Sequence, residues 1–178
     1  ASDVYKRQII YYTDPKTGEY HELQQLYGTE NRIWVSYDDI PLDLVHAAIS
    51  IEDKRFPTHK GVDWIRTLAA VKGFAGGSSS FGGSTITQQL IKNLSQEDEV
   101  TVDRKVQEIF RALEVEKRYT KSEIMEWYLN TIYLGEGCYG VQSAARVYFG
   151  KKVSDLTTAE CASLIAITNN PSLYDPYI

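Results

Sequence analysis

The segment PLDLVHAAISIE, residues 41–52, decides the fold class of this chain. Its opening proline suits the first position of a helix, where the N–H that proline lacks would have no partner. The residues that follow place apolar side chains at the i, i+3, i+4, i+7 spacing of one helical face, namely Leu44, Ala47, Ala48 and Ile51. We therefore expect a helix that begins at Pro41 and turns this face toward a core.

Helical patterns continue to the end of the chain. We expect a long helix between Thr101 and Tyr119, with one apolar stripe made of Val102, Val106, Ile109, Phe110 and Leu113. Two further helices are expected where a threonine precedes a glutamate by three residues, the spacing of a capping box. These pairs are Thr120 with Glu123 and Thr157 with Glu160.

The N-terminal part differs from this helical region. Residues 8–12 are rich in β-prone side chains, residues 14–18 have turn chemistry, and residues 32–37 alternate between apolar and polar side chains. The sequence therefore predicts a β-rich lead-in over residues 1–37 and a mainly helical domain over residues 38–178. The chain opens with alanine rather than methionine, so we expect a piece of a longer protein. Residues 1–8 resemble sequence that is foreign to the natural protein, and no expectation rests on them.

Composition excludes several classes of protein. At 178 residues, with 43% hydrophobic and 24% charged residues, the chain can bury a globular core. Its formal net charge of −5 argues against a nucleic-acid partner, which would select a basic surface. Two cysteines form no disulfide framework and match no metal-ligand spacing, and no apolar run is long enough to span a membrane.

Glu52 extends the apolar side of the first expected helix, since Val45, Ala48 and Ile49 lie one and two turns before it. A partly desolvated carboxylate at such a position suits a general acid or base. The alternative is an acid at a helix end that points into solvent, and periodicity alone favours this alternative.

Glu108 lies on the long helix, on the side away from the apolar stripe, and shares a face with Arg104 and Arg111. Such an arrangement is commonly an exposed ladder of ion pairs. It is also suited to organise a phosphate group or a phosphate-bound divalent cation.

The stretch GGSTITQQLIKN, residues 82–93, follows the Gly/Ser-rich loop of residues 73–83 and opens a helix. Free N–H groups at a helix start, beside serine and threonine hydroxyls, favour an anion or a sugar hydroxyl. The spacing is not that of a P-loop. His59 is an isolated histidine in a turn, and such residues are more often structural than catalytic.

In combination, four segments resemble glycosyltransferase family 51, the peptidoglycan glycosyltransferases of class A penicillin-binding proteins and monofunctional transglycosylases. They are IEDKRFPTHKGVDW at 51–64, GGSTITQQLIKN at 82–93, RKVQE at 104–108, and the run from residue 119 to residue 176. The resemblance covers about residues 38–176. It implies a mainly helical, lysozyme-like fold, in agreement with the periodicity.

The resemblance also implies roles for individual residues. Glu52 corresponds to the general base, and Glu108 to a second carboxylate that assists the leaving pyrophosphate. Three cations correspond to phosphate ligands: Lys92, Arg104 and Lys105. Other motif positions line or support the donor site, namely Ser84, Gln89, Asn93, Asp53, Phe56 and His59. Three features depart from the family pattern: the Gly/Ser-rich loop of residues 73–83, Cys161 and residues 168–170. We expect neither Cys161 nor residues 168–170 to touch the catalytic residues.

The implied reaction is the inverting polymerisation of lipid II into β-1,4 glycan with release of undecaprenyl pyrophosphate. We expect no resident metal site. We do expect a divalent cation, Mg²⁺ or Mn²⁺, that binds together with the substrate pyrophosphate. The implied partners are lipid II, the growing glycan, a membrane surface and a transpeptidase domain in the parent chain or in another protein. The implied place is the extracytoplasmic face of the cytoplasmic membrane, with Phe74 and Phe81 as candidate insertion residues. Family members bind the antibiotic moenomycin in the donor site. The competing interpretations are a lysozyme-like enzyme that cleaves glycan and a non-catalytic scaffold module.

Overall fold

The computed structural model of the chain describes residues 8–13, 20–26, 31–75, 83–95, 101–174 and 177. It separates into two compact units, Ala1–Glu30 and Asn31–Ile178. In the first unit, strands β1 (Gln8–Thr13) and β2 (Tyr20–Leu26) pair antiparallel, with a shift of register after Ile10. The strand predicted at residues 8–12 is confirmed, whereas the turn predicted at 14–18 lies outside the described residues.

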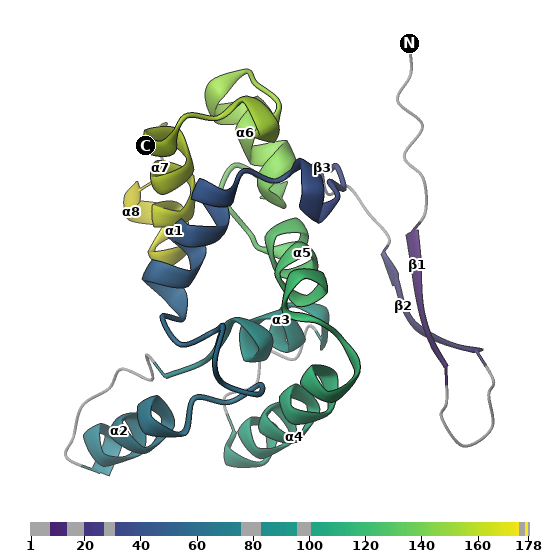
Figure 1. Cartoon of the computed structure of the whole chain (residues 1–178), viewed down its shortest axis with the longest axis vertical. Coiled ribbons are helices and arrows are strands. Elements are labelled where there is room, and N and C mark those ends of the chain that lie inside the picture. The colour runs from purple at the N-terminus through teal and green to yellow at the C-terminus, as the bar shows by residue number, and fades with distance from the viewer. Residues whose placement is uncertain are drawn as a thin grey trace. The chain divides into compact units, whose positions relative to one another are not determined.

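The second unit is mainly helical, as predicted (Figure 1). Its short strands β3 (Asn31–Arg32) and β4 (Cys138–Tyr139) pair in parallel. In chain order the helices are η1 (Tyr37–Asp39, a 3-10 helix), α1 (Leu42–Glu52), α2 (Trp64–Ala75), α3 (Ile86–Ser95), α4 (Val102–Arg118), α5 (Lys121–Thr131), α6 (Val141–Phe149), η2 (Val153–Asp155, 3-10), α7 (Thr158–Asn169) and α8 (Pro171–Tyr174). No helix within the described residues is both long enough and apolar enough to cross a bilayer.

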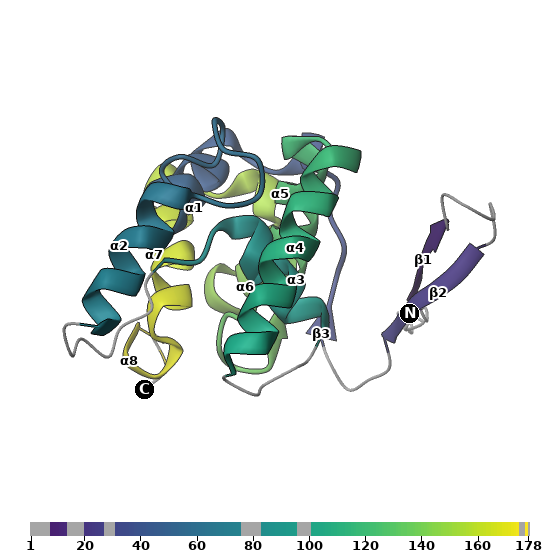
Figure 2. The same cartoon turned by 90° about the horizontal axis from the view of Figure 1, so that it is seen from below.

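Helix α5 lies inside the second unit, and three of its apolar side chains are fully buried, Ile124, Tyr128 and Leu129. Helix α3 packs against both α4 and α5, and α1 packs along α7 (Figures 1 and 2). Both predicted capping boxes are present, at the first turns of α5 and α7. The arrangement brings the end of α1, the start of α3 and the end of α7 into one region.

Helix α1 confirms the prediction made from its sequence, with two adjustments. Pro41 is the N-cap, so the helix begins at Leu42. Leu44 and Ala48 are fully buried, but Ile51 remains 38% exposed and does not complete the buried face. The core-facing side of α1 therefore ends before Glu52, at the edge of the packed region.

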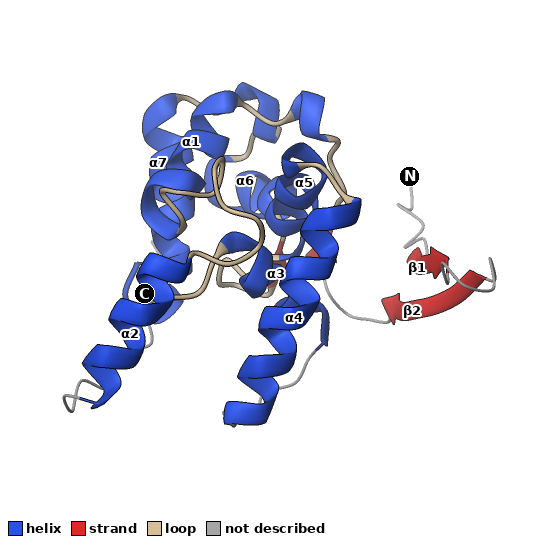
Figure 3. Cartoon of the chain, turned by 60° about the horizontal axis from the view of Figure 1, so that its bottom comes forward, coloured by secondary structure: helices blue, strands red, loops and turns tan. Residues whose placement is uncertain are grey.

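The apolar stripe predicted on α4 is divided between solvent and core. Val102 is 80% and Phe110 is 64% exposed, whereas Ile109 and Leu113 pack against a small buried cluster. Glu108 lies on the side of α4 that was expected to be exposed, yet it is buried. Burying this charge is feasible because Gln88 of α3, with Arg104 and Lys105 of α4, supplies hydrogen bonds to its carboxylate. One end of α2 and one end of α4 project beyond the other helices in Figure 3, although α4 packs against α3.

The strand predicted from the alternation over residues 32–37 is also wrong beyond Arg32. This segment finds its hydrogen-bond partners in side chains of α5 and α6 rather than in a neighbouring strand. The amide of Asn130 brackets Val35, accepting from its N–H at 2.9 Å and donating to its carbonyl at 2.8 Å. Glu126 accepts from the N–H of Tyr37 at 2.7 Å, and Ser143 accepts from Ile33 at 3.1 Å. Backbone groups that are satisfied in this way need no sheet.

Candidate active site

Glu52 is the last residue of α1, and helices α3 and α7 hold its carboxylate from two directions. Gln89 Nε2 donates to Oε2 at 2.9 Å, and Thr168 Oγ1 lies 2.8 Å from Oε1. Both groups are uncharged. The expectation that residues 168–170 do not touch the catalytic residues is therefore wrong for Thr168, because the last turn of α7 packs beside the end of α1.

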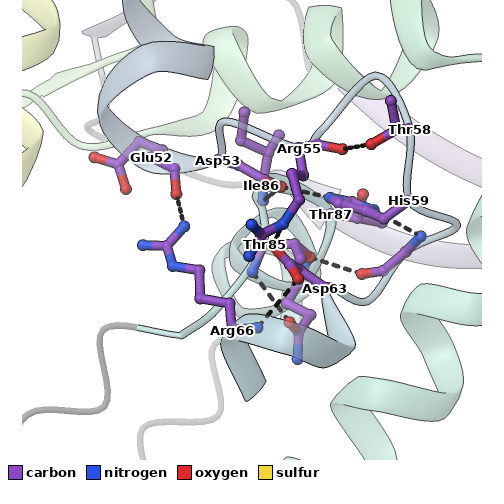
Figure 4. Close-up of polar contacts among 12 residues, drawn as sticks. Glu52, Asp53, Arg55, Thr58, His59, Asp63, Arg66, Thr85, Ile86 and Thr87 are labelled. Carbon is purple, nitrogen blue, oxygen red and sulfur yellow. Dashed lines mark hydrogen bonds and ion pairs between the residues drawn. The ribbon is translucent and has the colours of Figure 1, made fainter. Parts of the chain in front are cut away.

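Asp53 directly follows Glu52 but points the opposite way, into the protein (Figure 4). Its Oδ2 accepts from the backbone N–H of Ile86 at 3.0 Å, at the start of α3, and contacts His59 Nε2 at 2.7 Å. The N–H of Gly61 donates to His59 Nδ1 at 3.1 Å, so the proton of a neutral imidazole is on Nε2 and is donated to Asp53. Asp53 and His59 thereby lock the α1 end to α3.

The loop from Asp53 to Asp63 is closed by a second buried carboxylate. Asp63 accepts from Arg55 Nε at 2.7 Å and from the N–H of Arg66 at 3.1 Å. Burial acts to raise the pKa of Asp63, but these hydrogen bonds and the charge of Arg55 outweigh it and hold that pKa below its ordinary value. The guanidinium of Arg66 also donates to the backbone carbonyl of Glu52 (Figure 4). The first turn of α2 is thus tied to the end of α1.

Glu108 has a different environment from Glu52, since cations contact it. Lys105 Nζ donates to Oε1, and Arg104 Nη1 lies 3.4 Å from Oε2. Gln88 Nε2 donates to Oε1 at 3.1 Å. Lys105 also donates to Ser84 Oγ at 2.7 Å, which joins the segment before α3 to α4. The carboxylate is buried, while both cations retain some solvent exposure.

Close packing at Gly61 sets the distance between the α1–α2 loop and α4. Gly61 has a φ of +92°, and a Cβ at this position would lie 2.5 Å from the carbonyl oxygen of Ala112. Its own carbonyl accepts from Thr85 Oγ1 at 2.7 Å, and the N–H of Thr85 donates to Gln88 Oε1 at 3.0 Å. A continuous set of contacts thus runs from the loop through the start of α3 to Glu108.

The predicted site residues fall into three groups. One joins Glu52 to Gln89, one joins Asp53, Phe56 and His59 beneath the α1 end, and one joins Ser84, Arg104, Lys105 and Glu108. Lys92 and Asn93 are exposed on α3, and no described contact links either side chain to a carboxylate of the site. Asp53 and Phe56 are buried, which indicates that they support the site through their neighbours.

Several residues of this region were not found from the sequence. Gln88 lies in the quoted motif beside Gln89, and only the tertiary packing shows that its amide reaches Glu108. The side chain of Glu116 on α4 is 3% exposed, accepts from Thr87 Oγ1 at 2.6 Å and pairs with Lys121 at 2.5 Å. Tyr128 lies buried below the site, and its burial, with the charges of Glu52 and Asp53, raises its pKa far above the ordinary value.

Among the described residues, no three potential metal ligands of the types His, Cys, Asp and Glu come together. Glu108 is a single carboxylate with a lysine and an arginine beside it. Such a group suits an ion that arrives with phosphate oxygens, since Mg²⁺ commonly takes only one or two protein carboxylates and completes its shell with phosphates and water.

The family model described as Transglycosylase matches residues 19–178. The chain belongs to the transglycosylase family. The resemblance seen in its motifs is thereby confirmed. This transglycosylase chain is 43% identical over 171 residues to penicillin-binding protein 1A of Aquifex aeolicus (strain VF5), covering 93% of the chain and 24% of that protein. It is 46% identical over 156 residues to penicillin-binding protein 1A of Escherichia coli (strain K12), covering 87% of the chain and 18% of that protein.

A third relative is penicillin-binding protein 2D of Bacillus subtilis (strain 168), which is 44% identical over 175 residues, 96% of the chain and 24% of that protein. The chain thus spans about a quarter or less of the length of these relatives. The stretch that the family model matches, residues 19–178, includes Glu52, Glu108 and the whole helical unit.

Proposed function

We propose that this transglycosylase chain polymerises lipid II into β-1,4 peptidoglycan glycan. The observation that carries the proposal is the contrast between the two carboxylates. Glu52 is held by an amide and a hydroxyl, whereas Glu108 is contacted by Lys105 and Arg104. Two carboxylates in such unlike surroundings suit two different roles.

In the proposed mechanism Glu52 acts as the general base. It takes the proton of the 4-hydroxyl of the acceptor N-acetylglucosamine as that oxygen attacks the anomeric carbon of the donor N-acetylmuramic acid. The bond from the anomeric carbon to the phosphate oxygen breaks, and its electron pair leaves with undecaprenyl pyrophosphate. Attack opposite the leaving group converts the α-linkage of the donor to the β-linkage of the product.

In this mechanism the cations of the site stabilise the departing pyrophosphate. Arg104 and Lys105 are tethered at one end to Glu108, which fixes where their positive charge lies. Charge that develops on the departing pyrophosphate is stabilised by such preorganised donors. Lys92 is exposed on α3 and is proposed as a further phosphate ligand, with Ser84, Gln89 and Asn93 toward the donor sugar. A Mg²⁺ or Mn²⁺ that enters on the pyrophosphate would bind Glu108 and neutralise phosphate charge.

We also propose that the chain works at a membrane, on the extracytoplasmic face of the cytoplasmic membrane where lipid II is presented. Two helices support this, because α2 exposes Trp64, Ile65 and Leu68 and α4 exposes Val102, Val106 and Phe110. The insertion residues predicted from sequence, Phe74 and Phe81, lie outside the residues whose side chains are described. The relatives' names support a penicillin-binding transpeptidase domain as partner, in the parent chain or in a second protein.

The test is polymerisation of labelled lipid II in detergent with Mg²⁺. We expect lysozyme-sensitive polymer from the wild-type chain and its loss in the presence of moenomycin. Glu52→Gln should lower the rate at least about 100-fold, because it removes the base. The matched control is Glu114→Gln, an exposed carboxylate on α4 that should retain the wild-type rate.

Two outcomes would contradict the proposal. Cleavage of preformed glycan without polymerisation would favour the lysozyme-like alternative. A folded wild-type chain that neither polymerises lipid II nor binds moenomycin would favour the scaffold alternative.

A further inference from the structure

Thr168, in the last turn of α7, lies against the carboxylate of Glu52, although its segment departs from the family pattern. Its Oγ1 lies 2.8 Å from Glu52 Oε1, and Gln89 Nε2 lies 2.9 Å from Oε2. Among the described residues, each carboxylate oxygen therefore has one hydrogen-bond partner, and the two partners come from different helices. The carboxylate is held in one rotational position from both sides.

The hydroxyl of Thr168 has a second contact, which makes it unlike Gln89. Its Oγ1 is also 2.7 Å from the backbone carbonyl of Ile165, one turn earlier on α7. A hydroxyl carries one proton and can accept as well as donate, whereas an amide nitrogen only donates. Thr168 can thus donate to a charged Glu52, or donate to Ile165 and accept from a protonated Glu52.

We propose that Thr168 is the positioning residue of the general base and that it serves both protonation states of Glu52. The inference rests on the proposed function, in which Glu52 receives the proton of the acceptor hydroxyl. Before transfer, Thr168 donates to Oε1 and fixes the carboxylate. After transfer, the proton resides on Oε1 and is donated to Thr168 Oγ1, whose own proton turns to the carbonyl of Ile165. No bond of Thr168 is made or broken.

The surroundings of Thr168 make it a rigid partner. A β-branched side chain on a helix has few χ1 positions, and the contact with Ile165 selects one of them. The neighbouring residues Leu164, Ile165 and Ile167 are buried in the core, so the last turn of α7 cannot shift freely. Gln89 holds the other oxygen but cannot accept a proton on its amide nitrogen. The assignment of the proton to Oε1 follows from this difference.

The test compares Thr168→Val with Thr168→Ser in the full chain, with lipid II as substrate. Valine keeps the shape and removes the hydroxyl, and we expect kcat to fall about tenfold or more while KM stays within about twofold. Serine restores the hydroxyl, and its kcat should lie within about threefold of wild type. The matched control is Ser163→Ala on the same helix, where Ser163 Oγ donates to the Ala159 carbonyl at 2.8 Å without reaching Glu52. Its kinetics should match wild type.

Circular dichroism and thermal melting establish that each variant is folded. If Thr168→Val is unstable, the serine variant and Thr168→Ala provide the same comparison of hydroxyl against no hydroxyl. The inference is overturned if Thr168→Val has the wild-type kcat, or if the valine and serine variants lose activity equally. The proposed function still stands in that case, provided that the wild type makes polymer and Glu52→Gln makes none. If the wild type makes no polymer, or Glu52→Gln remains active, the proposed function and the inference fall together.

Discussion

Gln88 and Gln89, consecutive residues of α3, hold the two different carboxylates of the site. Gln88 Nε2 donates to Glu108 Oε1 at 3.1 Å, and Gln89 Nε2 donates to Glu52 Oε2 at 2.9 Å. Successive side chains on a helix point about 100° apart, so one helix can serve α4 on one side and α1 on the other. The separation of the carboxylates of Glu52 and Glu108 is therefore set by α3.

This relationship predicts that replacing Gln88 by methionine mainly lowers stability, whereas replacing Gln89 by methionine mainly lowers activity. Gln88 is fully enclosed and also accepts from Thr85, so Gln88→Met should lower the free energy of unfolding by about 1–3 kcal/mol. Gln89 is partly exposed, so Gln89→Met should leave stability within about 0.5 kcal/mol and lower kcat. Urea unfolding and polymerisation rates check the pair. Equal destabilisation by both changes would contradict this division.

The tandem glutamines also show where sequence reasoning ends. The family resemblance implied that Gln89 lines the donor site, and it assigned no role to Gln88. Which of two neighbouring glutamines meets which acid depends on how α3 lies between α1 and α4, and no periodicity contains that information. The same limit explains α4, where Glu108 is buried beside Gln88 of α3 while Val102 and Phe110 of the apolar stripe are exposed.

Gly61→Ala should be much more harmful than an alanine at another left-handed glycine. At Gly61 the new Cβ would meet the carbonyl oxygen of Ala112 at 2.5 Å, and the φ of +92° is unfavourable for alanine. We expect a loss of about 2–5 kcal/mol in unfolding free energy. Gly150 is the matched control, because its φ is +65° but no atom lies within 4 Å of the added Cβ. There the cost should be about 1–2 kcal/mol. Similar values for both variants would show that the contact with α4 is unimportant.

Asp53→Ala should destabilise the fold although Asp53 belongs to the first motif. The change leaves the N–H of Ile86 and the imidazole of His59 without their buried acceptor, so we expect a loss of about 2–5 kcal/mol in urea unfolding. Asp39→Ala is the control, because this exposed carboxylate accepts only from Ser36 among the described contacts, and the change should cost about 0.5 kcal/mol or less. A stable Asp53→Ala chain would point instead to a direct role toward substrate.

The features predicted most reliably from the sequence are those that depend on residues close together in the chain. The helix at residues 41–52 and both capping boxes were predicted because they depend on neighbours in the chain. The segment after Arg32 was predicted as a strand and is not one, since Asn130 and Glu126 are nearly a hundred residues away and supply its hydrogen bonds. Thr168 was missed for the same reason, because its partner Glu52 is distant in sequence and close only after α7 packs on α1.

The start of α7, the helix that carries Thr168, should respond to pH through Glu160. Its hydrogen bond with Lys151, and then that with the N–H of Thr157, lower the pKa of Glu160 from 4.5 to about 2. A lowered pKa in the folded state stabilises the fold above pH 4.5, and this contribution is lost as the pH falls from 4.5 toward 2. Glutamine can still serve the capping box but cannot pair with lysine. We therefore expect Glu160→Gln to melt below wild type at pH 7, with the gap closing as the pH falls through this range. Lys151→Met should give a similar gap at pH 7, and the double variant should add little to either single change. A gap that stays constant with pH would show that the side chain of Glu160 acts through packing rather than through its charge.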